Sequence, residues 1–154
     1  MDRSFLHLTV AAIVVHQQIF LFVEEIDKVS GRRVLNQPAG HVEANEDLNT
    51  AVCRELHEET GLILAPQGWL GLSQLLTAAQ HRYVRVNFVF QPQTLPLAYQ
   101  PLDPDILGLH WFTLEELLSH KLPPRSPLVV DAIQRYQAGA MLPLSFIEDV
   151  VTLA

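Results

Sequence analysis

The N-terminal segment of the chain is strongly apolar and is interrupted once by polar residues. From Ser4 to Val23 it contains no Asp, Glu, Lys or Arg, and its length is close to that of a bilayer span. The triplet His16-Gln17-Gln18 divides it, β-branched residues dominate the first part, and no small-residue cleavage site follows. We therefore predict two β-strands joined by a turn rather than a transmembrane helix or a signal peptide.

The segment from Asp47 to Leu62 has the clearest helical periodicity in the chain. Its apolar residues recur every three or four positions, and Gly61 stands where a helix-ending glycine is expected. These apolar residues are Leu48, Ala51, Val52 and Leu56. The pattern predicts a helix with one buried stripe.

Short strands and helices follow, separated by turns that contain Pro or Gly. Strands are predicted over 34–35, 69–77, 83–91 and 106–112, with a turn over 36–40 and a Pro-rich loop over 92–104. Thr113 and Glu116 match a capping box that opens a short helix, and residues 127–138 form a last amphipathic helix that Gly139 ends. The order of elements predicts a single mixed α/β domain with helices packed on a sheet.

The strand predicted over 83–91 has two different faces. Its even positions, from Val84 to Phe90, are apolar and are expected in the core. The other face carries Arg85 and Asn87. It either lines a cleft, where these side chains contact phosphate or base, or is an exposed strand face, and the pattern leaves both interpretations open.

Composition and charge narrow the class of protein. The chain has 154 residues, of which 49% are hydrophobic and 18% are charged, which is typical of one globular domain over residues 1–154. Its formal charge of −7 argues against a sequence-independent grip on a nucleic acid strand. The single cysteine, Cys53, cannot form an internal disulfide and favours a reducing, cytoplasmic location.

Three carboxylates break the apolar stripe of the predicted helix. Glu55 and Glu59 fall in the same sector as the apolar residues, and Glu58 lies at its edge. Carboxylates at this spacing repel one another and oppose the helix dipole, so a cation is expected to compensate them. Oxygen ligands of this kind suit Mg²⁺, with Mn²⁺ as a substitute.

The segment around these carboxylates resembles the signature of the Nudix hydrolases. That signature is a glycine, five residues, a glutamate, seven residues, and then Arg-Glu-aliphatic-x-Glu-Glu-x-Gly-aliphatic. It is filled without departure by Gly40, Glu46, Arg54, Glu55, Leu56, Glu58, Glu59, Gly61 and Leu62. The resemblance implies an α/β/α sandwich with a central mixed sheet and hydrolysis of a diphosphate linked to another moiety.

The same resemblance implies a role for each signature residue. Glu55, Glu58 and Glu59 would hold divalent metal together with the carbonyl of Gly40, and one of Glu55 and Glu59 would take the proton of the attacking water. The remaining pair, Glu46 and Arg54, would brace the loop, helix and loop that carry these ligands.

A second likeness covers most of the chain. The segments 36–41, 103–111, 125–129 and 136–139 are similar to those of a bacterial branch of the family that releases orthophosphate. This likeness implies thiamine pyrophosphate, hydroxymethylpyrimidine pyrophosphate and nucleoside di- and triphosphates as substrates. Candidate substrate contacts are Asn36, Gln37, Arg85, Asn87 and Asp105. Asp103 and Asp105 either add a metal ligand or base, or form a capped turn.

Other functions remain open, both enzymatic and non-enzymatic. A house-cleaning nucleoside triphosphate pyrophosphohydrolase or a dinucleoside polyphosphate hydrolase would use the same carboxylates on another substrate. A catalytically silent nucleotide-binding module would keep the fold without turnover, although it would have no need for a costly buried acid cluster. No membrane partner is expected, and the chain is expected to be a monomer or a small homo-oligomer.

Overall fold

The computed structural model describes residues 3, 5–96 and 100–154. Residues 97–99 of the predicted Pro-rich loop, and Ser4 at the start of the apolar segment, lie outside the described part. The apolar N-terminal segment forms a hairpin of β1 (Leu6–His16) and β2 (Ile19–Ile26). Gln17 and Gln18 form the turn with φ of 48° and 66°, the positive values that a tight two-residue hairpin turn requires.

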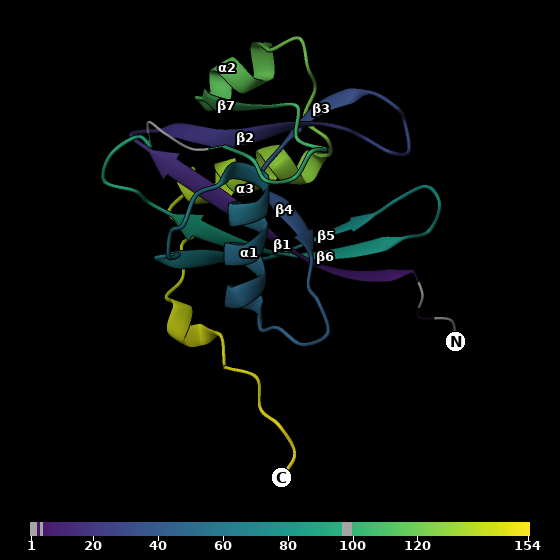
Figure 1. The fold of residues 1–154 in the computed structure, drawn as a ribbon, viewed down its shortest axis with the longest axis vertical. Coiled ribbons are helices and arrows are strands. Elements are labelled where there is room, and N and C mark those ends of the chain that lie inside the picture. Colours follow the sequence, from purple (N-terminus) through teal and green to yellow (C-terminus); the bar gives the residue numbers. More distant parts are fainter. Residues whose placement is uncertain (1–2, 4, 97–99) are drawn as a thin grey trace.

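The strands form one mixed sheet of seven members (Figure 1). Its main path runs β3-β2-β1-β6-β5, with β4 added to β1 and β7 added to β2. The other strands are β3 (Arg33–Asn36), β4 (Ala39–His41), β5 (Gly68–Leu76), β6 (Arg82–Phe90) and β7 (Gly108–Phe112). Strands β1 and β6 are parallel over nine paired residues, whereas the other pairs are antiparallel.

The sheet opens where its strands change partners. Pairing between β1 and β2 is confined to the hairpin end, at Val15 with Phe20 and His16 with Ile19. Farther from the turn, β1 pairs with β4 while β2 pairs with β3 and β7. The connection from Asn36 to Ala39 therefore crosses between two diverging parts of the sheet.

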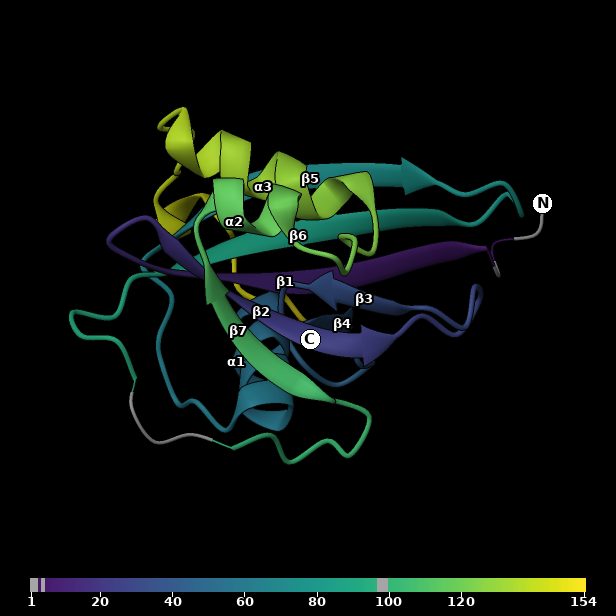
Figure 2. The same ribbon diagram turned by 90° about the horizontal axis from the view of Figure 1, so that it is seen from above.

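Helices cover both faces of the sheet, as the α/β/α prediction requires (Figure 2). These are α1 (Leu48–Thr60) on one side, and α2 (Leu114–Ser119) and α3 (Pro127–Gln137) on the other, followed by a 3₁₀ turn, η1 (Leu144–Phe146). Thr113 and Ser126 cap the N-termini of α2 and α3 by accepting backbone N–H groups. No helix among the described residues is long and apolar enough to cross a membrane.

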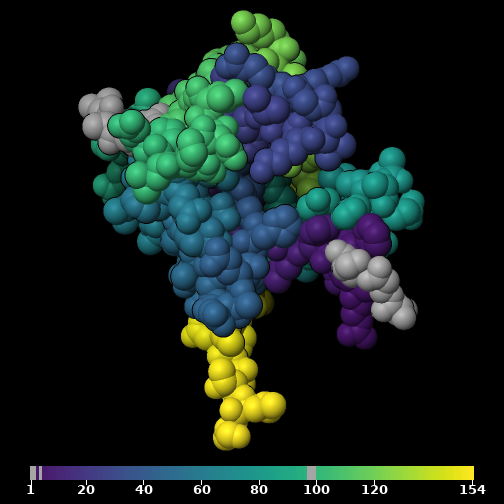
Figure 3. Space-filling model, turned by 45° about the vertical axis from the view of Figure 1, so that its right-hand side comes forward, coloured from purple at the N-terminus to yellow at the C-terminus, as the bar shows by residue number. Residues whose placement is uncertain are grey.

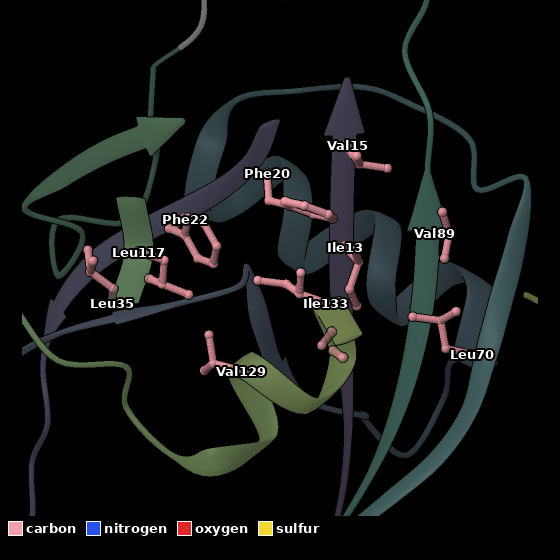
Figure 4. Close-up of a cluster of buried hydrophobic side chains, with 12 residues drawn as sticks. Ile13, Val15, Phe20, Phe22, Leu35, Leu70, Val89, Leu117, Val129 and Ile133 are labelled. Carbon is pink, nitrogen blue, oxygen red and sulfur yellow. The ribbon is translucent and has the colours of Figure 1, made fainter. Parts of the chain in front are cut away.

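Alternate residues of β1 belong to two different cores. Ala11, Ile13 and Val15 pack with α3 and with aromatic residues of β2 (Figure 4). The intervening residues of β1 pack with α1 and with Val86, Phe88 and Phe90 of β6. Because both faces of β1 are covered, its sequence is a continuous apolar run that does not alternate with polar residues.

One expectation about strands needs correction, and one open alternative is excluded. The turn predicted over residues 36–40 is partly extended, since Ala39–His41 form β4 against β1. The face of β6 that carries Arg85 and Asn87 is not an exposed strand face, because both side chains are buried between the sheet and the α3 layer. Apolar spacing alone could not reveal this, because α3, which covers this face, lies in a later part of the chain.

Candidate active site

The signature helix α1 begins and ends at well-defined caps. Asp47 accepts a hydrogen bond from the Thr50 N–H at 2.7 Å at the start. At the end, Gly61 has φ of 78° and donates its N–H to the carbonyl of His57. A Cβ at Gly61 would overlap the carbonyl of Gln100, so a glycine is required both by conformation and by space. The caps thus fix where the carboxylates of the last two turns lie.

Arg54 holds together the two ends of the signature segment. Its Nε and Nη2 donate to the two carboxylate oxygens of Glu46 at 2.9 and 2.6 Å, and Nη2 also donates to the carbonyl of His41. Its Nη1 donates to Glu55 at 2.8 Å and to Glu58 at 3.3 Å. Hydrogen bonding to Arg54 lowers the pKa of Glu46 below its ordinary value. One guanidinium therefore orients three carboxylates.

The carboxylate of Glu55 lies directly against the backbone of Gly40. A Cβ at Gly40 would overlap all three carboxyl atoms of Glu55, so any larger residue would displace this side chain. Burial raises the pKa of Glu55 despite its contact with Arg54, and the neighbouring Glu58 adds to the effect. Glu58 is at the edge of the helix face and its side chain is 48% exposed.

Glu59 is the most deeply buried of the three helix carboxylates, at 6% exposed. Its Oε2 has no hydrogen-bond partner among the described residues, while the backbone N–H of Ala39 hydrogen-bonds the carboxylate. Burial raises the pKa of Glu59 to about 9, and the nearby carboxylates of Glu25 and Glu55 act in the same direction. An enclosed carboxylate oxygen without a donor, set among like charges, has the chemistry of a cation ligand.

The loop after β6 adds one more carboxylate to this region. The N–H groups of Leu102 and Asp103 donate to the carbonyl of Glu58 at 2.8 and 2.9 Å, which ties the loop to the last turn of α1. Asp103 thereby lies close enough to Glu59 that its charge raises the pKa of the Glu59 carboxyl. Asp103 also accepts the N–H of Asp105 at 2.8 Å, which is the capped turn that the sequence allowed.

The chemistry of this cluster fits a divalent cation. Within the described part of the chain, no three His, Cys, Asp or Glu side chains already converge as a metal-binding group. Two of the three helix carboxylates are instead directed toward Arg54. After side-chain rotation, these oxygens and the unpartnered Glu59 Oε2 form a donor set suited to a hard cation. Gly40 has no side chain, which permits the close approach of Glu55.

Three of the candidate substrate contacts meet on the α3 side of the sheet. Arg85 donates through Nη2 to Asn36 Oδ1 at 3.2 Å and to Gln37 Oε1 at 3.1 Å. Gln37 also donates to the carbonyl of Val129 in α3, and Asn36 donates to Glu25. Asparagine, glutamine and arginine are therefore packed as a group rather than spread along a surface.

The other two candidates lie apart from this group. Asn87 is fully buried and donates to Ser73 Oγ at 3.0 Å, while its Oδ1 has no partner among the described residues. Asp105 is exposed, and its carboxylate lies 3.9 Å from Lys28 Nζ. The structure thus brings Asn87 near the α3 layer and leaves Asp105 at the surface.

Two neighbours of these groups were not among the predicted site residues. Arg125, just before α3, donates to Glu25 Oε1 at 2.8 Å, and the same oxygen accepts from Asn36. Glu25 belongs to an acidic pair within β2, and Arg125 precedes the last predicted helix. Only the pairing of strands and helices far apart in sequence reveals that they are close together.

Comparisons with known proteins find relatives across most of the chain. Residues 5–133 match the family model described as NUDIX domain. Phosphatase NudJ of Escherichia coli (strain K12) is 39% identical over 143 residues, which cover 93% of this chain and 91% of that protein. The similarity therefore extends well beyond the signature segment.

Solved structures give the same result at the level of the fold. A NUDIX hydrolase from Nitrosomonas europaea superposes with a TM-score of 0.84 at 33% identity, covering 94% of this chain and 97% of that one. The NUDIX domain of Shewanella oneidensis NrtR, solved with ADP ribose, superposes with a TM-score of 0.71 at 20% identity, covering 90% and 93%. The second likeness concerns the fold alone.

Proposed function

This chain belongs to the Nudix family and is a Nudix hydrolase, and from that premise we propose its reaction and substrates. We propose that it uses Mg²⁺ to hydrolyse the diphosphate linkage of small nucleotide or pyrimidine, thiamine-related, pyrophosphates and releases orthophosphate. The observation that carries the proposal is the 39% identity to a phosphatase of the family across 93% of the chain. The complete acid cluster on α1 supports turnover rather than binding alone.

In the proposed reaction, water attacks the terminal phosphorus of a diphosphate. The bond from that phosphorus to the bridging oxygen breaks, orthophosphate is released, and the organic monophosphate keeps the bridging oxygen. Glu55, Glu58 and Glu59, with the carbonyl of Gly40, would hold the cation. When bound, it neutralises phosphate charge and lowers the pKa of a water molecule.

The residues of the chain would contribute position and a proton acceptor. Arg54 would set the directions of Glu55 and Glu58 through Nη1, while its bidentate contact with Glu46 fixes the guanidinium itself. Both Glu55 and Glu59 are candidates for the base. Glu59 is favoured by its enclosed, unpartnered Oε2, because Glu55 Oε1 is already engaged by Arg54.

The test is phosphate release from a panel of substrates with Mg²⁺ or with EDTA. The panel contains thiamine pyrophosphate, hydroxymethylpyrimidine pyrophosphate, nucleoside di- and triphosphates, ADP-ribose and diadenosine polyphosphates. Each is measured with and without added inorganic pyrophosphatase, which separates release of orthophosphate from release of pyrophosphate.

We expect Mg²⁺-dependent orthophosphate directly from the first three groups of substrates. Signal that requires pyrophosphatase would replace the proposal by a nucleoside triphosphate pyrophosphohydrolase. Turnover of diadenosine polyphosphates alone would favour a dinucleoside polyphosphate hydrolase. A lack of turnover across the panel, with nucleotide binding retained, would favour a silent binding module.

A further inference from the structure

Arg85 is a buried cation without an acidic partner. Its side chain lies on β6 and the residue is 4% exposed. Its hydrogen bonds among the described residues go to the neutral amide oxygens of Asn36 and Gln37. Arg54 and Arg125 each form an ion pair with a carboxylate, whereas no described ion pair includes Arg85. A buried guanidinium without a counter-ion is strongly unfavourable unless a ligand supplies one.

Several N–H groups of the Arg85 guanidinium make no hydrogen bond to the described residues. An arginine carries five N–H groups, and both contacts of Arg85 use Nη2, which leaves those of Nη1 and Nε. Neither nitrogen is among the fully enclosed unpartnered atoms of the described residues, which are His57 Nδ1, Glu59 Oε2 and Asn87 Oδ1. These N–H groups therefore have no acceptor among the described residues, and a bound phosphate would supply one.

The position of Arg85 relates it to the acidic cluster. The carboxylates of Glu25, Glu59 and Asp131 favour its charged form, although burial, with Arg125, lowers the pKa of Arg85 to about 10. The backbone N–H of Ala39, two residues after Gln37, hydrogen-bonds the Glu59 carboxylate, so one short connection contacts both Arg85 and the acidic cluster. Figure 3 shows the surface hollowed between the β2–β3 segment and the β5–β6 hairpin, with the yellow-green of α3 at the bottom. Strands β3 and β6, which carry Asn36 and Arg85, belong to the two sides of this hollow.

We propose that Arg85, held by Asn36 and Gln37, is a phosphoryl-binding subsite that grips a diphosphate substrate beside the carboxylates of α1. A planar guanidinium with free N–H groups matches phosphate oxygens, which accept several charge-assisted hydrogen bonds. The subsite selects substrates with two adjacent phosphoryl groups, because one is held by Arg85 while the other lies at the acidic cluster. This inference rests on the proposed function, since it assigns a contact within the same site.

The test measures binding separately from turnover. Methylenediphosphonate, a diphosphate analogue whose bridging carbon resists hydrolysis, is titrated calorimetrically into the protein saturated with Mg²⁺. Arg85→Gln is expected to weaken this binding by about tenfold to a hundredfold, as for the loss of hydrogen bonds to a charged group. Affinity for Mg²⁺ alone is expected to stay within about twofold, because Arg85 contacts none of the helix carboxylates.

A matched control is available on the same side of the sheet. Arg135 of α3 donates to the carbonyl of Leu72 and to Ser73 Oγ, so Arg135→Gln removes an equal charge without touching Asn36 or Gln37. Binding of methylenediphosphonate to this variant is expected to match the wild type. Unchanged binding to Arg85→Gln, or a parallel loss of Mg²⁺ and diphosphonate affinity, would overturn the proposal, since the second result marks a purely structural role.

A second measurement covers the case in which Arg85→Gln does not fold. In the wild-type protein, the Nε–Hε NMR signal of Arg85 is expected to shift when methylenediphosphonate is added, while that of Arg135 stays in place. A stationary Arg85 signal at saturation would refute the subsite. Binding through Arg85 without hydrolysis of the substrate panel would refute the proposed function and leave the subsite standing, so the two failures are distinguishable.

Discussion

The acidic cluster on α1 and the group around Arg85 are built in opposite ways. On α1, Arg54 contacts the carboxylates of Glu46, Glu55 and Glu58, so one cation serves several acids. On the α3 side, Arg85 has neutral partners and no acid in direct contact among the described residues. The first group has an excess of negative charge and the second an excess of positive charge. A ligand that carries both a cation and phosphates would satisfy the two together.

The two groups also differ in how the chain assembles them. The carboxylates of α1 follow one another within a single helix, so local caps are sufficient to align them. The Arg85 group takes side chains from β3, from the connection to β4 and from β6, which are joined only by strand pairing. The first group therefore depends on the signature segment, and the second depends on the tertiary fold.

The largest expected effect is on the acidic side, at Glu59. Glu59→Gln keeps the shape of the side chain but removes its charge and its capacity as a base, so we expect kcat to fall by about a thousandfold or more. Circular dichroism is expected to show an unchanged fold. Glu115→Gln, an exposed residue of α2, is the control and should retain full activity. An active Glu59→Gln enzyme would remove Glu59 from the proposed mechanism.

The same substitution tests whether the acidic cluster destabilises the protein when a chelator is present. Burial raises the pKa of Glu59 from 4.5 to about 9, so the folded state binds an extra proton between these values. Its contribution to stability is therefore greatest below pH 4.5 and is lost as the pH rises to 9. In EDTA, the Tm of Glu59→Gln minus that of the wild type is expected to increase from pH 5 to pH 9. A constant difference would mean that Glu59 is not buried as described.

Sequence reasoning predicts the acidic cluster on α1 much better than the Arg85 group. Helical spacing placed Glu59 on the buried face and Glu58 at its edge, because the period of one helix fixes both. Whether Arg85 is buried depends on which element covers β6. The element that does so, α3, begins more than 40 residues after Arg85. Strand β4 was missed for the same reason, since its three residues are extended only because β1 lies beside them.

A third expected effect concerns how the acids are held. Arg54→Lys keeps the positive charge, but an ammonium cannot contact Glu46 bidentately and also reach Glu55 and Glu58. We expect kcat/KM to fall by about tenfold to a hundredfold, the usual loss when a group that orients metal ligands is changed. Arg32→Lys in the exposed loop before β3 is the matched control. Equal activity of the two variants would show that charge alone, without the fork geometry of Arg54, maintains the cluster.

The smallest expected effect separates two aspartates of the same loop. Asp103 lies near Glu59, whereas Asp105 is exposed beside Lys28. Because a partly screened charge contributes a few tenths to about 1 kcal/mol, Asp103→Asn is expected to weaken Mg²⁺ affinity by about two- to fivefold. Asp105→Asn should change it by less than about 1.5-fold, since surface substitutions of this kind are nearly neutral. Calorimetric titration of both variants with Mg²⁺ decides the matter: a larger loss for Asp105→Asn would return that residue to the site and extend the acidic side along the loop.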